Sequence, residues 1–426
     1  MDPAAAHPPQ QSDDDRAQRA ITLLEEQQLA HEFDSMSRRT RKRRLVLFFG
    51  RATFSDNTKY LFLKSLERER NYEVLWCSFE ADLVQSLTSR GLPCVQLAQN
   101  IDRSIDLLMH AAVAVFCVNP NESLKGSYSL NACLAGAKKL QLWHGVSVKH
   151  LLLRLIPHLG VRELSFRRAF YMASQADHVL STASTFDAFW RECFGCRQLV
   201  RAGLPRNELL VRPPTGLEML GAEVNPEIDE GLSSGRKNVL VVPTWQRGHQ
   251  TYVNDPDFFT KVMVFGRTQK VNFFFKMHPT YYVQNMDTRK KAEGFYLLSP
   301  GTDLYPLMNR FDALLTDYSS IMFDFLLTRK PVLSLDLAKD EHQRFEPDFS
   351  LVPDVDFRHK FTRDDFEKKL NTALYDDHRA PQREEMIGKI FETDPALACD
   401  QLLNLVDRLV ESAVAGDDYT VDHCGA

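Results

Sequence analysis

Short apolar runs alternate with longer amphipathic segments along most of this chain. Residues 45–50, with the sequence LVLFFG, are typical of a strand that is buried on both faces of a sheet. We expect further strands in the first half at 72–77, 94–97, 112–118, 140–143 and 178–181, and helices at 57–70, 80–90, 101–110, 127–137 and 185–194. Strands that alternate with helices in this way predict βαβ units and a parallel sheet.

The same alternation restarts in the second half of the chain. We expect strands at 238–242, 271–277, 295–298, 313–315 and 331–335, and helices at 257–265, 288–293, 304–310, 321–327, 361–375 and 396–414. The turn-forming sequence PPTG at 213–216 and the acidic, Gly-rich residues 227–235 are typical of a connector. The pattern therefore predicts an α/β protein with two Rossmann-type, doubly wound domains that face each other across a cleft.

The domain boundaries follow from this alternation. Residues 1–44 are expected to be largely flexible, with one amphipathic helix at 21–33. The predicted parts after them are a first domain at 45–215, a linker at 216–236, a second domain at 237–378 and C-terminal helices at 379–426. In such sheets ligands bind beyond the carboxyl ends of the strands.

Composition is that of a globular protein. Of the 426 residues, 44% are hydrophobic and 26% are charged. The net charge of −5 argues against a general nucleic-acid binder. No apolar run approaches the ~18 residues that a membrane-spanning helix needs, and the N-terminus lacks the basic-then-apolar layout of a secretion signal. We therefore expect a cytoplasmic protein.

Six cations fall within residues 38–44, which read RRTRKRR. One interpretation is a solvated charged segment ahead of the first strand. Another is a patch that contacts anionic lipid, at roughly 1 kcal/mol per cation near a charged membrane surface. Nucleic acid comes third, because no aromatic residues are interleaved with the cations. An anionic membrane surface is therefore a candidate partner, with the protein peripheral on the inner face of the plasma membrane.

Eight cysteines are scattered through the chain, most of them in apolar segments, as expected of reduced and buried thiols. Cys193 and Cys196 form a single C-x-x-C, but no second pair with metal-ligand spacing accompanies it. The sequence thus predicts no metal site.

Polar residues follow several of the predicted strands. They are His144 and Gly145 after the strand at 140–143, Lys276, His278 and Pro279 around the end of 271–277, and Thr244 and Arg247 after 238–242. Arg206, in the sequence GLPRN, is a further cation and lies shortly before the predicted linker. Each histidine alone could be structural, but two at strand ends in opposite domains favour a site in the cleft.

The segment 312–325, DALLTDYSSIMFDF, joins a buried strand to a helix through polar residues. Backbone N–H groups at such a helix start, with the hydroxyls of Ser319 and Ser320 beside them, are suited to a phosphate or diphosphate. The simpler interpretation is that Ser319 only caps the helix. Asp317 lies within this corner, and Asp324, one turn into the helix, either binds ligand or braces the turn.

Several common nucleotide and hydrolase motifs are absent. The chain contains no G-x-x-x-x-G-K-[ST], no G-x-G-x-x-G and no G-x-S-x-G elbow between a predicted strand and a following helix, and no D-x-D at a strand end that would bridge a diphosphate through a metal. The charge of a bound diphosphate must then be met by helix dipoles, hydroxyls, histidines, Lys276 and Arg206.

Five motifs occur in order along the chain: WHGVSVK at 143–149, GLPRN at 203–207, PTW at 243–245, KMHP at 276–279 and TDYSSIMFDF at 316–325. Together they resemble the CDP-glycerol glycerophosphotransferase family of teichoic-acid and capsule polymer synthesis, over residues 45–340. The chain departs from the family at Val146-Ser147, where the family usually has Thr-Pro, and at Glu208, where it commonly has Asp.

The resemblance implies a GT-B architecture with an acceptor-side first domain and a CDP-donor second domain. It implies transfer of glycerol phosphate, or ribitol phosphate, from CDP-glycerol or CDP-ribitol to a hydroxyl of a growing polymer or lipid-linked primer, with release of CMP. No cofactor is implied, and a need for Mg²⁺ is left open.

By this resemblance, and by its place at a strand end, His144 is the expected general base, a role worth ~10²–10⁴-fold in rate. His278, Ser319 and Ser320 are expected to hold the diphosphate and to stabilise the departing CMP. Further expected contacts are Thr244, Arg247, Arg206, Lys276, Asp317 and Asp324, with Gly145, Lys149 and Pro279 completing the motifs. Two alternatives are a GT-B glycosyltransferase that uses a nucleotide sugar for surface polysaccharide synthesis, and a non-catalytic scaffold that keeps the fold.

Overall fold

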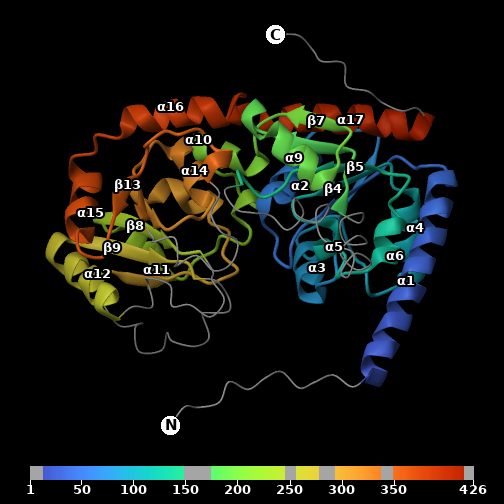
Figure 1. Ribbon diagram of the computed structural model, residues 1–426, viewed down its shortest axis with the longest axis horizontal. Coiled ribbons are helices and arrows are strands. Elements are labelled where there is room, and N and C mark those ends of the chain that lie inside the picture. Colours follow the sequence, from blue (N-terminus) through green and yellow to red (C-terminus); the bar gives the residue numbers. More distant parts are fainter. Residues whose placement is uncertain (1–12, 148–173, 245–255, 278–292, 337–348, 417–426) are drawn as a thin grey trace.

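The computed structural model describes residues 13–147, 174–244, 256–277, 293–336 and 349–416. Within them the chain forms two parallel α/β units side by side, with a pair of helices running along one edge of both (Figure 1). The predicted class, two doubly wound domains, is therefore confirmed.

The first domain contains a parallel sheet in the order β3-β2-β1-β4-β5-β6-β7. Its strands are β1 (Leu45–Phe49), β2 (Glu73–Ser78), β3 (Cys94–Gln96), β4 (Val113–Phe116), β5 (Lys138–Gln141), β6 (His178–Ser181) and β7 (Gln198–Arg201). All five residues of β1 are buried, as the apolar run predicts for a central strand covered by helices on both faces. The edge strand β7 was not predicted, because its sequence QLVR has no continuous apolar run.

The helices of this domain are α2 (Asp56–Glu67), α3 (Ala81–Thr88), α4 (Ile101–His110), α5 (Pro120–Ser123), α6 (Tyr128–Ala132), α9 (Asp187–Phe194) and α10 (Glu208–Val211). The helices α2, α3, α4 and α9 lie at expected positions, the short α5 and α10 were not predicted, and α6 needs a correction. The helix expected at 127–137 ends at Ala132, because β5 already begins at Lys138 and the chain must turn in between.

The second domain contains a parallel sheet in the order β10-β9-β8-β11-β12-β13. Its strands are β8 (Lys237–Val242), β9 (Val271–Phe275), β10 (Phe295–Leu297), β11 (Ala313–Thr316), β12 (Val332–Leu335) and β13 (His359–Phe361). Its helices include α12 (Pro256–Gln269), the short α14 (Ile321–Phe325) and a 3₁₀ segment at Tyr305–Arg310. The helix expected at 361–375 begins only at Phe366 as α15 (Phe366–Tyr375), because residues 359–361 pair with β12 as a strand. The helix expected at 288–293 lies almost wholly outside the described residues.

The segment predicted as a flexible linker, 216–236, is partly helical. It contains a 3₁₀ turn at Leu217–Met219 and α11 (Pro226–Ser233). Asn225 caps α11 by accepting the N–H of Ile228 at 2.8 Å, and Pro226 occupies the first helical position, where its missing N–H costs nothing. Most of the acidic, Gly-rich residues 227–235 therefore lie in a capped helix within the connector.

The expectation of a largely flexible N-terminal segment is wrong for residues 13–39, which form the single helix α1 (Asp13–Arg39) against α6. Much of the basic run that follows is bonded within the protein. Arg43 pairs with Asp106 at 2.9 Å, and the buried amine of Lys42 donates to the carbonyl of Met109 at 2.6 Å.

The C-terminal helices connect the two domains. After α15, α16 (Ala380–Ile390) lies along the second domain, and α17 (Ala398–Ala415) returns across the first (Figure 1). Two carboxylates of α17 form ion pairs with the first domain: Asp407 lies 2.7 Å from Arg68, and Glu411 lies 2.5 Å from Arg44. The last helix of the chain is therefore part of the first domain's packing.

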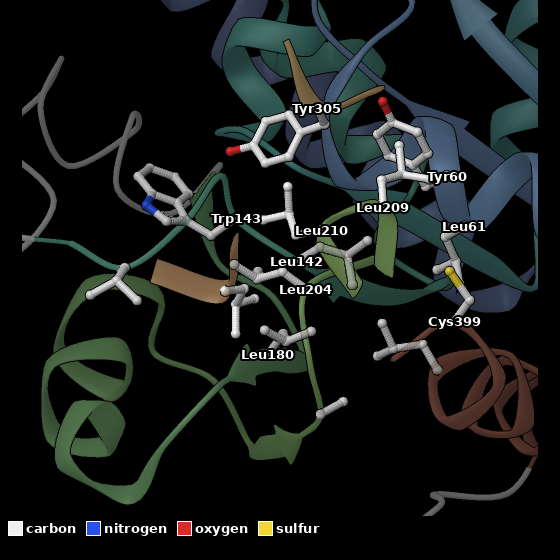
Figure 2. Close-up of a cluster of buried hydrophobic side chains, with 14 of the residues drawn as sticks. Tyr60, Leu61, Leu142, Trp143, Leu180, Leu204, Leu209, Leu210, Tyr305 and Cys399 are labelled. Carbon is white, nitrogen blue, oxygen red and sulfur yellow. The ribbon is translucent and has the colours of Figure 1, made fainter. Parts of the chain in front are cut away.

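One continuous apolar core reaches from one domain into the other. Figure 2 shows Leu209 and Leu210, from the connection after β7, in a single cluster with Leu142 and Leu180 of the first domain and Tyr305 of the second. This continuity fixes how the two sheets face each other.

A fully buried ion pair also crosses between the domains. The amine of Lys59, on α2, lies 2.8 Å from the carboxylate of Asp303 in the second domain, and both side chains are almost completely excluded from solvent, at 0% and 1% exposure. The same amine donates to the carbonyls of Glu218 at 2.8 Å and Leu220 at 2.7 Å. A buried lysine with three acceptors is fully satisfied, which is the condition for tolerating it in a core.

Replacing Lys59 with Met should destabilise the protein by about 3–5 kcal/mol, because Asp303 would be left buried without its cation. Chemical denaturation of the wild type and the variant measures this free energy of unfolding. Lys64→Met, on the exposed side of the same helix, is the control and should cost less than about 1 kcal/mol. Equal losses in the two variants would contradict a special role for the buried pair.

Candidate active site

A cleft of about 620 Å³ lies between the two domains. Its walls come from the loops that follow the carboxyl ends of β1, β8, β9 and β11. Its lining includes Arg51, Asp56, Pro243, Lys276, Tyr305, Ser319 and Arg206. Ligands of doubly wound sheets bind at this end of the strands, so the cleft lies where the strand-end motifs predict it.

The Ser319-Ser320 corner follows β11 directly. Both serines are half-buried, and Ser319 lines the cleft. Ser320 occupies the N-cap position of α14, but its backbone is already helical, with φ −61° and ψ −18°, and its hydroxyl makes no capping hydrogen bond. The simple capping interpretation is therefore not what the geometry shows, and the proposed contact with phosphate stays a prediction.

Asp317 and Thr244 are neighbours in the folded chain and are joined by hydrogen bonds. The carboxylate of Asp317 accepts the backbone N–H of Thr244 at 2.9 Å and also its hydroxyl, and it accepts the N–H of Tyr318 at 2.7 Å. Both residues are buried. They join the ends of β8 and β11 and so hold the corner in shape.

Arg206 lies at the junction of the two domains. Its guanidinium donates to Asp56 of the first domain at 2.7 Å, to Asp324 of the second at 2.6 Å, and to the carbonyl oxygen of His144 at 2.8 Å. Burial alone lowers the pKa of Arg206, but Asp324, Tyr305 and Asp56 outweigh it and raise the pKa above its ordinary value. The cation is therefore permanent, and the two domains share it.

Asp324 is completely buried, and its carboxylate is surrounded by donors. Besides Arg206 it accepts the hydroxyl of Tyr305 at 2.6 Å and the side-chain amide of Asn207 at 3.1 Å. Of the two interpretations left open for this residue, these contacts favour the one in which it braces the turn.

The loop that carries His144 is held in an unusual conformation. Trp143 has φ +54° and Gly145 has φ +121°, values that a residue with a side chain rarely adopts. The amide of Asn57 donates to the carbonyl of Trp143 at 2.7 Å, and Gln141 accepts the N–H of Trp143 at 2.9 Å. Backbone held this way at a strand end is a feature of functional loops.

Gly145 allows the two domains to approach each other closely. A Cβ atom added there would lie 2.7 Å from a guanidinium nitrogen of Arg206, and 3.8 Å from the hydroxyl oxygen of Ser320. The glycine is therefore needed at this position, and the His144 loop of the first domain lies against the serine corner of the second. The described residues 143–147 of the first motif and the motifs at 203–207 and 316–325, far apart in sequence, meet here.

Lys276 follows β9 and lines the cleft. Its amine donates to the carbonyls of Pro300 at 2.9 Å and Thr302 at 2.8 Å. Burial lowers the pKa of Lys276 to about 8, although the nearby carboxylate of Asp303 opposes part of this effect. The lysine is thus mostly charged at neutral pH, and it is positioned to meet an anion in the cleft.

Four predicted residues, His278, Arg247, Lys149 and Pro279, lie outside the described residues, and their roles stay predictions.

Within the described part of the chain, no group of three or more His, Cys, Asp or Glu residues is arranged to hold a metal ion. Cys193 is buried and Cys196 half-buried, neither forms a disulfide, and burial raises the pKa of Cys196 to about 11. A raised pKa disfavours the thiolate that metal binding or redox chemistry needs.

Sequence reasoning missed Asp56, Asn57 and Tyr305. Asp56 has φ +72°, a strained conformation for a residue with a side chain, and it begins α2 directly after the loop from β1. The polar run SDNT at 55–58, which lies shortly after the strand predicted at 45–50 and contains the start of the helix predicted at 57–70, was the available signal. Tyr305 gave no such signal, because its partner Asp324 is reached only in the folded chain.

One departure from the family pattern has a structural explanation. Glu208 is buried, and its carboxylate accepts the backbone N–H of Cys399, at the start of α17, at 2.6 Å. It also accepts the guanidinium of Arg212 at 3.1 Å. The side chain therefore connects the segment after Arg206 to the C-terminal helix.

The sequence model of the CDP-glycerol:poly(glycerophosphate) glycerophosphotransferase family matches residues 32–350. The chain belongs to this family. The match covers every motif around the cleft, from the His144 loop to the serine corner. Membership confirms the resemblance that the five motifs carry.

Curated relatives are similar over part of their length. The teichoic acid poly(glycerol phosphate) polymerase of Bacillus spizizenii is 26% identical over 222 residues, which are 49% of this chain and 55% of that protein. The teichoic acid ribitol-phosphate polymerase TarK of Staphylococcus aureus is 27% identical over 177 residues, 39% of this chain and 33% of that one. The chain thus spans about half of the first relative and a third of the second.

A solved structure of the wall teichoic acid polymerase TagF, from a soak with CDPG, superposes with a TM-score of 0.66 at 18% identity. The superposition covers 93% of this chain and 96% of that one. At this identity the likeness shows the fold, and it confirms the expected GT-B-like arrangement of two domains with C-terminal helices.

The affinity of the cleft for CDP should fall above pH 8. Lys276 loses its positive charge as the pH rises through about 8, and a hydrogen bond from a charged donor is worth about 1.5–3 kcal/mol, so binding should weaken by roughly tenfold between pH 7 and pH 9. Calorimetric titration with CDP at pH 7, 8 and 9 measures the change. In Lys276→Arg the charge persists and the pH dependence should disappear. An equal fall in both proteins would assign the effect to another group.

Proposed function

We propose that this protein transfers glycerol phosphate, or ribitol phosphate, from a CDP-activated polyol to a hydroxyl group of a growing teichoic-acid-like or capsular polymer or its primer, and releases CMP. The observation that carries the proposal is the meeting of the His144 loop and the Ser319-Ser320 corner across Arg206. The loop that carries the candidate base in one domain thereby lies against the candidate phosphate corner of the other.

The reaction requires one bond exchange at phosphorus. The acceptor hydroxyl attacks the phosphorus next to the polyol, a new P–O bond forms, and the anhydride P–O bond to CMP breaks. The imidazole of His144 takes the proton of the attacking hydroxyl, because imidazole is the side-chain group suited to general base catalysis at neutral pH. The electron pair of the broken bond leaves on the phosphate of CMP.

Stabilisation of negative charge supplies most of the catalysis in such transfers. Among the described groups that line or border the cleft, the hydroxyls of Ser319 and Ser320 and the amine of Lys276 are proposed to meet the diphosphate. His278 and Arg247 are proposed to add to them, on the grounds of the sequence motifs. Arg206 is committed to Asp56 and Asp324, so its role is to hold the two domains in register around the ligand.

The donor is proposed to carry either polyol. Relatives of this chain include proteins named for glycerol phosphate and for ribitol phosphate, and the chain covers only part of each. The described residues that face the cleft include no group specific to one polyol over the other. Both donors therefore belong in the test.

We also propose that the protein acts at the cytoplasmic face of the plasma membrane, where a lipid-linked acceptor would be found. In the described part of the chain, no helix is long and apolar enough to cross a bilayer. Attachment would then be peripheral, through exposed cations of the basic run such as Arg39 and Arg41.

The protein should release CMP when it is incubated with CDP-glycerol or CDP-ribitol and an oligomeric polyol-phosphate acceptor. Mass measurement of the product should show an increase of one or more polyol-phosphate units. The panel also contains UDP- and CMP-sugars, since a glycosyltransferase on the same fold would release nucleotide from those donors instead. Turnover with a nucleotide sugar alone would replace the proposed reaction by glycosyl transfer. A rise in melting temperature with a donor, without any turnover, would favour the scaffold alternative.

The variants His144→Ala and His278→Ala should remain folded and lose CMP release by ~10²-fold or more, because each removes a group proposed to act on the reacting atoms. Circular dichroism and the melting temperature check the fold, and the CMP assay measures the rate. His110→Ala, a half-buried histidine on α4 away from the cleft, is the matched control and should keep full activity. Full activity in either test variant would remove that histidine from the mechanism.

A further inference from the structure

A basic hollow of about 740 Å³ lies on the first domain, away from the cleft. Its walls come from the end of α1, from residues just before β5 and β7, and from the last turn of α17. Figure 1 shows the end of α1 close to the end of α17, at the outer edge of the molecule. The cleft lies beyond the carboxyl ends of the parallel strands, so this hollow is at the opposite, amino end of the sheet.

The hollow gathers cations from segments that are far apart in sequence. They are Arg38, Arg39, Arg41, Lys42, Lys138 and Arg197, and the only carboxylate among the described lining residues is that of Asp177. Two helices end here, and each helix C-terminus carries roughly half a negative charge. Asp177, which lies 3.9 Å from Arg197, and Asp34, which pairs with Arg38 at 2.7 Å, offset part of this charge, but cations still outnumber carboxylates in the described lining, an excess of positive charge. Like charges repel, so this excess favours an anionic ligand.

One wall of the hollow is fixed by buried contacts. The amine of Lys42 donates to the carbonyls of Ser37 at 2.9 Å and Met109 at 2.6 Å. A Cβ atom added at Gly136 would lie 2.3 Å from the carbonyl oxygen of Ser37 and 2.6 Å from the amine of Lys42, so a glycine is needed for this packing. The backbone that carries the exposed Arg39 and Arg41 is therefore held in place by the buried contacts of the neighbouring residues.

We propose that this hollow binds a phosphate-bearing anion, such as a phosphodiester or a short polyphosphate. Arginine predominates among its cations, and the planar guanidinium fork matches phosphate oxygens better than a lysine amine does. The ligand's phosphate could belong to a phospholipid headgroup or to a soluble polyol-phosphate chain. The site shares no described residue with the cleft and does not depend on the proposed transfer reaction.

Calorimetric titration with inorganic tripolyphosphate tests the site, with saturating CDP present to occupy the cleft. Wild-type protein should bind it, and Arg39→Gln/Arg41→Gln should bind at least about tenfold more weakly, since each cation contributes appreciably near a charged ligand. Arg90→Gln/Arg267→Gln removes the same charge from exposed positions outside the hollow and should bind like the wild type. The comparison keeps its meaning if CDP does not bind, because the cleft is identical in all three proteins.

Absence of binding to the wild type, equal affinity in the hollow variant, or an equal loss in both double variants would overturn the proposal. Sedimentation with vesicles of phosphatidylglycerol and phosphatidylcholine then distinguishes the sources. Vesicle binding that needs Arg39 and Arg41 and is displaced by tripolyphosphate assigns a lipid headgroup. Tripolyphosphate binding without vesicle binding assigns a soluble anion. The rate of CMP release at saturating concentrations of donor and soluble acceptor should be the same in Arg39→Gln/Arg41→Gln and the wild type, because the hollow shares no described residue with the cleft, so this test and that of the transferase function fail independently.

Discussion

The buried guanidinium of Arg206 is the interaction on which the arrangement of this protein depends. It binds a carboxylate from each domain, Asp56 and Asp324, and the carbonyl of His144. A buried cation between two carboxylates is tolerated only when the geometry satisfies all three groups, and removal of one partner leaves an uncompensated charge. The strained backbone at Asp56 and Trp143 and the glycine at 145 are local costs of the same arrangement. The candidate site is therefore assembled by the contact between the domains and not by either domain alone.

Much of the fold could be predicted from the sequence because its strands are buried on both faces. Runs such as LVLFF in β1 and VNFFF in β9 leave little choice of structure. The strands that were missed, β7 and β13, are short edge strands with polar residues, QLVR and HKF, and they gain their structure from pairing with a neighbour. The N-terminal helix α1 was underestimated for a similar reason, since its packing against α6 is a tertiary contact that composition does not reveal.

The residues of the candidate site also differ in how far the sequence could predict them, and for the same reason. His144, Lys276 and Ser319 could be proposed because each lies at or shortly after the end of a recognisable buried strand, and of the three Lys276 and Ser319 line the cleft. Asp56, Asn57 and Tyr305 could not, because their functional neighbours are distant in sequence. Motif reasoning also could not separate a ligand-binding carboxylate from a bracing one: Asp324 looked equally suited to both roles until its contacts to Arg206, Asn207 and Tyr305 were visible.

The return of α17 to the first domain has a mechanical consequence. The chain passes between the domains twice, once after Arg206 and once before α17, and the two passages touch: Gly203 packs against Pro395 and Ala398, and Glu208 bonds to the start of α17. Two adjacent connecting segments form a hinge along one edge of the two domains. Rotation about that edge strains the connections less than translation or twisting of one domain relative to the other. Rotation about that edge would widen the far side of the cleft most, and it would have to separate Arg206 from Asp324.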